Sequence, residues 1–157
     1  MDLQELKKRY LEIEKKHKLP PFSKLNEDFE IDKIDKDTDY IARAIRKAMI
    51  DKIVNSLNFI EMLLNQMNAP RLYIPFLRTM NGDDKKLMDD LYARLGGLSM
   101  LSLELEIDYS EKQESDAIKK IYESWNSIKP DFRKILSKIN NPSLSQSLIK
   151  KEKSYFG

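Results

Sequence analysis

The sequence contains no cysteine in its 157 residues. This absence excludes disulfide bonds, thiolate zinc sites, iron–sulfur ligation and a cysteine nucleophile, because each of them needs the Cys sulfur. No apolar run approaches the roughly 20 residues that cross a membrane. The first residues also lack the basic and then apolar layout of a signal peptide. We therefore expect a cytoplasmic protein without a membrane segment.

Glycine is scarce as well, with four residues, whereas charged residues make up 34% of the chain. This composition is typical of a helical protein rather than a sheet protein, whose turns use glycine. The 28 Lys and Arg nearly balance the 26 Asp and Glu, so the net charge is +2. The molecule therefore has no overall field that would attract nucleic acid or acidic ligands.

Apolar residues recur at alternating spacings of three and four along most of the chain, which predicts amphipathic helices. The predicted fold is all-α: an antiparallel helical bundle of three long helices plus an N-terminal helix and a short Pro-kinked helix. Short turns between the long helices favour antiparallel neighbours. The expected helices cover residues 2–18, 40–68, 70–80, 83–105 and 110–139.

Residues 29–34 alternate between apolar and polar types, which is the only strand-like run. A single strand has no partner in this chain. We expect instead an extended connector whose Phe29, Ile31 and Ile34 pack against the bundle. Residues 37–39, Asp-Thr-Asp, supply the N-cap of the helix that follows. The apolar face of that helix is predicted to contain Ile41, Ile45, Met49, Ile53, Ile60, Leu63 and Met67.

Two positions could interrupt the later helices. Gly96 and Gly97 each cost about 1 kcal/mol relative to alanine inside a helix. They mark either a break or a point where a neighbouring backbone passes close, and we favour close packing because the apolar pattern stays in phase on both sides. The same continuity across Pro130 favours one kinked helix over two separate helices.

Two motifs resemble parts of metal sites but are incomplete. Glu14 and His17 match the Glu-x-x-His unit of di-iron bundles, which need two such units, and His17 is the only histidine in the chain. Asp35, Asp37 and Asp39 open like a calcium loop, but the sixth position lacks the required Gly and the twelfth lacks the Glu. We expect no metal and no cofactor.

No residue pattern predicts an enzyme. The chain has no Gly-rich loop between a strand and a helix, and no Ser lies in a nucleophile elbow. An enzyme built from carboxylates such as Glu61 or Glu104 is the weakest alternative. Glu104, Glu106 and Asp108 crowd the C-terminal end of a predicted helix, where negative charge is unfavourable. The sequence offers no structural reason for these three acids.

We assign residues 1–141 to the helical bundle domain and residues 142–157 to a flexible or strap-like C-terminal tail. Pro142 stops the last helix, and the tail has too few apolar residues to offset its own ordering entropy. The alternative is a docked strap whose aromatic residues fill a gap in the bundle. The residues predicted to bind a partner are Leu148, Ile149, Lys150, Lys151, Lys153, Tyr155 and Phe156.

The leading functional prediction is a non-enzymatic protein-interaction module that binds an unidentified protein, with the tail as a contact. The alternative is a nucleic-acid-associated protein that uses the N-terminal helix and the basic tail, because basic residues mixed with aromatics can follow a phosphate backbone while stacking bases. A second such mixture occurs in the short Pro-kinked helix, where an amphipathic helix explains it better. Its residues are Arg71, Tyr73, Phe76 and Arg78.

The closing Ser154-Tyr155-Phe156 resembles the aromatic pair with which clamp-binding peptides of replication proteins fill an apolar pocket. Those peptides carry Gln six positions and an aliphatic residue three positions before the aromatic that aligns with Tyr155. This chain departs from the pattern, with Ile149 and Glu152 at these places. The resemblance covers three residues, implies a protein partner for the tail and identifies no family.

Overall fold

The computed structural model describes residues 2–35 and 37–140. Within these ranges the chain forms helices and turns and no strand, which confirms the predicted all-α bundle. The elements are α1 (Leu3–His17), α2 (Phe22–Phe29), the 3-10 helix η1 (Ile31–Lys33), α3 (Ile41–Leu64), the 3-10 helix η2 (Arg71–Tyr73), α4 (Ile74–Thr79), α5 (Gly82–Leu105) and α6 (Glu111–Ile139).

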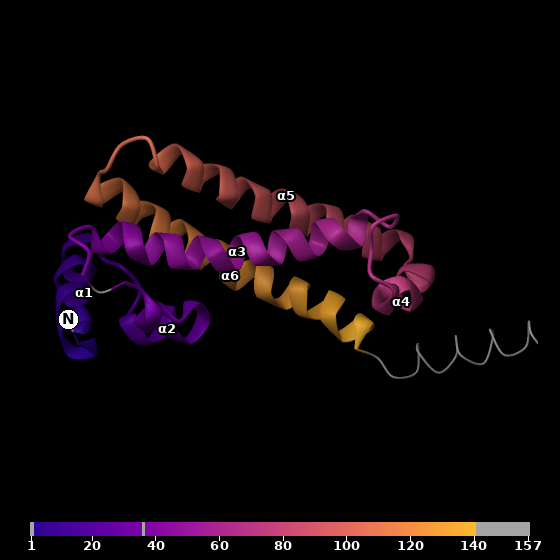
Figure 1. Ribbon diagram of the computed structural model, residues 1–157, viewed down its shortest axis with the longest axis horizontal. Coiled ribbons are helices and arrows are strands. Elements are labelled where there is room, and N and C mark those ends of the chain that lie inside the picture. The colour runs from indigo at the N-terminus through magenta and orange to yellow at the C-terminus, as the bar shows by residue number, and fades with distance from the viewer. Residues whose placement is uncertain (1, 36, 141–157) are drawn as a thin grey trace, which may run out of the picture.

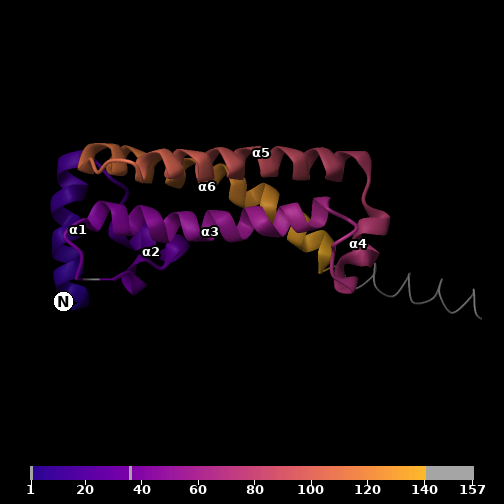
Figure 2. The same cartoon turned by 45° about the horizontal axis from the view of Figure 1, so that its top comes forward.

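The three long helices α3, α5 and α6 run in alternating directions and all pack against one another (Figure 1). The N-terminal helix α1 lies across one end of the three, and α4 lies at the other end, as both views show (Figure 2). The short elements therefore close the two ends of the bundle. No helix in the described ranges is long and apolar enough to cross a bilayer.

The core follows the predicted apolar faces closely. On α3 the buried positions include six of the seven predicted residues, and Met67 is the exception, with an exposed fraction of 97%. The helix ends at Leu64, so Met67 lies in the following turn rather than on a helical face. The buried apolar residues of α5 and α6 are Met88, Leu91, Leu95, Leu98, Ala117, Ile118, Ile121, Trp125, Ile128 and Ile135.

The segment before α3 differs from the prediction. Phe29 ends α2, Glu30 adopts a left-handed conformation with φ of 52°, and Ile31 begins η1, so residues 29–34 do not form an extended connector. Their packing is nevertheless as predicted, because Phe29 and Ile31 are buried and Ile34 packs against the core. The alternating pattern thus reflects two short helical turns that each direct one apolar side chain inward.

The start of α3 also differs from the prediction. Tyr40 occupies the N-cap position and makes no side-chain cap, so the Asp-Thr-Asp run does not cap the helix. Thr38 instead accepts a hydrogen bond from the Tyr40 backbone nitrogen at 3.1 Å, and Asp35 accepts one from the Asp37 nitrogen at 3.0 Å. These polar side chains satisfy the turn that precedes the helix.

The helix α5 is continuous through Gly96 and Gly97, and α6 is continuous through Pro130, as the apolar phase predicted. The predicted close approach of a neighbouring backbone at the two glycines is wrong. A Cβ atom at either Gly96 or Gly97 would meet nothing within 4 Å. Both glycines therefore lie on a side of α5 that no other described part of the chain covers.

We predict that Gly96→Ala and Gly97→Ala each raise the free energy of unfolding, by about 0.5–1 kcal/mol, since alanine restricts the unfolded backbone and clashes with nothing here. Denaturant unfolding at low protein concentration measures the change. A loss of stability in both variants would show that this side of α5 is packed.

Candidate functional site

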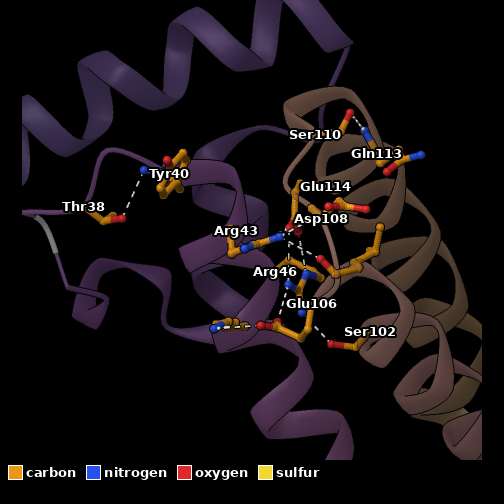
Figure 3. Close-up of polar contacts among 12 residues, drawn as sticks. Thr38, Tyr40, Arg43, Arg46, Ser102, Glu106, Asp108, Ser110, Gln113 and Glu114 are labelled. Atoms are coloured by element: carbon orange, nitrogen blue, oxygen red, sulfur yellow. Dashed lines mark hydrogen bonds and ion pairs between the residues drawn. The ribbon is translucent and has the colours of Figure 1, made fainter.

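A buried arginine of α3, Arg46, joins charged and polar side chains of α5 and α6 (Figure 3). Its Nε donates to Glu114 Oε2 at 2.5 Å, and one terminal nitrogen donates to Ser102 Oγ at 2.5 Å. The other terminal nitrogen donates to Glu106 Oε1 at 2.6 Å. Arg46 and Glu114 both have an exposed fraction of 0%. One guanidinium thus connects the three long helices where α5 ends and α6 begins.

A second arginine, Arg43, lies one helical turn earlier and shares the same carboxylate. Its Nε donates to Glu114 Oε1 at 2.8 Å, so both oxygens of Glu114 are occupied. A terminal nitrogen of Arg43 donates to the carbonyls of Leu105 at 2.7 Å and Asp108 at 3.0 Å. The guanidinium also lies over the Tyr109 ring, 5.2 Å from its centroid. Arg43 therefore stabilises the turn between α5 and α6.

The hydrogen bonds of the network favour the charged forms of Arg46 and Glu106. Burial by itself would lower the pKa of Arg46, but the hydrogen bonds to Glu114 and Glu106 outweigh it and raise that pKa. The hydrogen bond from Arg46 lowers the pKa of Glu106, and a further hydrogen bond from Lys47 acts in the same direction. Glu106 thus has the structural reason that the sequence did not supply.

His17 makes a structural contact between helices. Its Nε2 lies 2.8 Å from Glu111 Oε1, and Lys16 Nζ donates to the same oxygen at 2.7 Å. Lys119 of α6 donates to the backbone carbonyl of His17 at 3.2 Å. The ring of His17 is therefore directed at α6. Among residues 2–35 and 37–140 no group of three or more His, Asp or Glu is arranged to hold a metal ion.

The helix α5 also has large apolar residues on the side opposite its buried seam. Met100 and Leu103 have exposed fractions of 61% and 60%, and Ile107, just beyond the end of the helix, reaches 80%. At about 100° of rotation per residue these positions lie on the same side as the two open glycines. We call this side the outer face of α5. It consists of Ala93, Gly96, Gly97, Met100, Leu103, Glu104 and Ile107.

The outer face carries one charged residue, the exposed Glu104. Between Leu91 and Leu103 the only charged residue is Arg94, and its terminal nitrogen binds Asp131 of α6 at 2.7 Å and Asp90 at 2.8 Å. Here α3 and α6 cover one side of α5, and the described part of the chain leaves the outer face uncovered.

A shallow groove runs between α5 and α6 near the turn that joins them. Its volume is about 300 Å³. Leu101, Leu105 and Ala117 provide its apolar lining, and Glu104 and Lys120 add charge. Glu104 belongs to the outer face and Leu101 follows Met100 in the helix, so the groove adjoins the outer face on the side of α6.

The residues predicted from the sequence to bind a partner, Leu148 to Phe156, lie outside the described residues and stay a prediction. The basic residues of the N-terminal helix are partly engaged within the protein. Lys16 pairs with Glu111, Arg9 donates to the Thr38 carbonyl at 2.7 Å, and Lys7 lies over the Phe22 ring at 5.6 Å. This leaves less basic surface on α1 than the sequence alone implies.

The aromatic and basic mixture near α4 is an amphipathic structural element, as expected. Phe76 is buried, with an exposed fraction of 3%. Tyr73 packs edge to face against Phe59 of α3, with ring centroids 5.7 Å apart. Its aromatic residues therefore belong to the end of the bundle rather than to a stacking surface for bases.

We predict that Glu114→Ala lowers the free energy of unfolding by about 3–5 kcal/mol, because it leaves the buried Arg46 guanidinium without its main counter-charge. Denaturant unfolding gives the measurement. Glu123→Ala, at an exposed position of the same helix, is the control and should change stability by less than about 0.5 kcal/mol. Equal effects in the two variants would contradict a central role for the Arg46–Glu114 pair.

We also predict that the protein loses stability in acid. Hydrogen bonds from Arg46, Lys16 and Arg94 lower the pKa values of Glu106, Glu111 and Asp131, respectively. A carboxyl with a lowered folded pKa contributes its full stabilisation above its unfolded pKa.

For Glu106 the usual value is 4.5. Its contribution is therefore lost as the pH falls below this value and through the folded pKa. Denaturant unfolding measured between neutral pH and pH about 3 should show a decline in the free energy of unfolding. Glu106→Gln should make the acid dependence less steep. Stability that rises on acidification would contradict the proposed charge state.

Comparison of the chain with protein-family models, with curated proteins and with solved structures finds no match. Its function must therefore be inferred from the geometry of its own surface.

Proposed function

We propose that this chain is a non-enzymatic, cytoplasmic protein-interaction module that binds a protein partner through the outer face of α5. The observation that carries the proposal is the exposed apolar row of Met100, Leu103 and Ile107 beside two glycines with open space above them, with Glu104 as the one charged residue on this face. Contiguous exposed apolar surface of this kind marks protein interaction sites on proteins that are otherwise polar. This chain is otherwise polar, with 34% charged residues.

The outer face suits a helical partner. Exposed apolar residues at spacings of three and four provide anchors along one line, which is how amphipathic helices dock in grooves. Ala93, Gly96 and Gly97 have small side chains or none, so a partner backbone can approach α5 closely there. Removing each apolar Å² from water contributes roughly 25 cal/mol. The large residues therefore supply binding energy, and the small residues supply access.

The buried network prepares this surface for binding. Arg46 and Arg43 attach the C-terminal end of α5 to α3 and α6 through Ser102, Glu106 and the Leu105 carbonyl. A partner then meets a helix that is already ordered, so binding costs less conformational entropy than it would for a flexible segment. The tail residues between Leu148 and Phe156 remain a predicted additional contact in the same proposal.

The proposal differs from nucleic-acid binding in its response to salt. Phosphate contacts weaken steeply as ionic strength rises, whereas apolar contacts do not. The outer face has no basic residue to contact phosphate. We therefore expect binding of the partner to persist at high salt.

We predict that Met100→Lys combined with Leu103→Lys abolishes capture of the partner from a native lysate while the helical spectrum and melting temperature stay unchanged, because both side chains are already exposed. The control is Met67→Lys combined with Leu72→Lys, at two other exposed apolar positions. The control variant should retain the partner at both low and high salt. Identical capture by both variants, or capture lost from both, would show that the outer face is not the binding surface.

A further inference from the structure

A further cavity lies where α2, α3 and α6 meet. The short helix α2 lies alongside α3 in both views (Figures 1 and 2). The cavity has a volume of about 380 Å³, within the roughly 300–1,000 Å³ that is usual for small-molecule sites. Its lining residues belong to α2, α3 and α6, and none belongs to α5. A ligand in this cavity is therefore independent of the partner proposed for the outer face.

One wall of the cavity is apolar and largely aromatic. Trp125, Phe132 and Leu136 of α6 line it, and their spacings of seven and four place them on one side of the helix. The ring of Trp125 packs against Phe29, with centroids 6.0 Å apart. The ring of Phe132 packs edge to face against Phe59, with centroids 5.9 Å apart. Both rings are thus positioned by their neighbours before any ligand binds.

The charged residues around the cavity are three cations and two carboxylates. Both carboxylates already have a cation beside them. Lys129 Nζ donates to the two oxygens of Asp28, each at 2.8 Å. Glu27 lies 4.0 Å from Lys24. These pairings leave the other two cations of the cavity without a counter-charge.

Those two cations are Lys52 and Arg133, and neither forms an ion pair with another residue in the described part of the chain. Lys52 Nζ donates to the backbone carbonyl of Asp28 and lies 5.6 Å from the centroid of the Trp125 ring. An ammonium has three N–H donors, so this contact leaves two of them for a ligand. Arg133 is exposed, and its guanidinium offers a fork of donors that fits a carboxylate or a phosphate.

We infer that this cavity binds a small aromatic anion, whose carboxylate or phosphate is held by Lys52 and Arg133. The aromatic body lies against Trp125, Phe132 and Leu136. The inference combines two contributions. Hydrogen bonds from charged donors are stronger than those between neutral groups, and burial of the ring removes apolar surface from water. A ligand that lacks either the charge or the ring loses one of the two contributions.

The chain contains a single tryptophan, so the fluorescence of Trp125 reports on this cavity directly. Titration of the full-length chain with phenyl phosphate, with excitation where the probe does not absorb, should give a saturable change in emission. Benzyl alcohol supplies a neutral ring, and inorganic phosphate supplies the anion without a ring. Each should bind about tenfold more weakly or worse. No saturable change with phenyl phosphate, or equal affinity for either comparison probe, would overturn the inference.

Variants of the two cations show whether the cavity itself attracts the probe. Arg133→Gln and Lys52→Gln should each weaken the binding of phenyl phosphate by about tenfold, because each removes a charged donor. The matched control is Lys120→Gln, at an exposed position of α6 outside the cavity, which should bind as the unmodified chain does. Arg133 makes no ion pair with another described residue, so Arg133→Gln tests the cavity even if Lys52→Gln lowers stability. Equal affinity in Arg133→Gln and Lys120→Gln would overturn the inference.

Discussion

The ion pair between Arg46 and Glu114 is the contact on which the arrangement of the long helices depends. Both side chains are fully buried, so each would be costly to hold without the other. The cost is offset because every nitrogen of the Arg46 guanidinium finds an acceptor, on Glu114, Ser102 or Glu106. Such a pair contributes geometric specificity, because only one arrangement of α3, α5 and α6 satisfies all of these hydrogen bonds at once.

This constraint determines which side of α5 faces outward. Ser102 and Glu106 must point toward Arg46, so the rotation of α5 about its own axis is set by polar contacts as well as by its apolar seam. Met100, Leu103 and the two glycines are consequently turned away from the bundle.

Sequence periodicity predicted the helices well and their environment less well. The seam from Met88 to Ser102 and the continuity across Pro130 follow from spacing alone, since apolar residues at three and four positions must share a face. The same reasoning misplaced Gly96 and Gly97 in a close contact between helices. The phase of the apolar pattern shows that a helix continues. It does not show whether another element packs against a given side of that helix. The prediction that Met67 lies on the apolar face was an error of the same kind, because it required the helix to extend beyond Leu64.

The sequence contains residues of the candidate surface at recognisable positions, but their spacing alone does not show their role. Met100, Leu103 and Ile107 fall outside the buried phase of α5, and Arg46 falls beside Ile45 on an apolar face, but neither pattern names a partner. The sequence by itself determined the helical class, the lengths of the main helices and most of the core, because these depend on local propensity and on periodic burial. Only the tertiary structure decided that Arg46 meets Glu114 and that no other part of residues 2–35 and 37–140 covers the outer face of α5. Both outcomes depend on contacts between residues far apart in the chain. Such contacts cannot be predicted from the local pattern of a single helix.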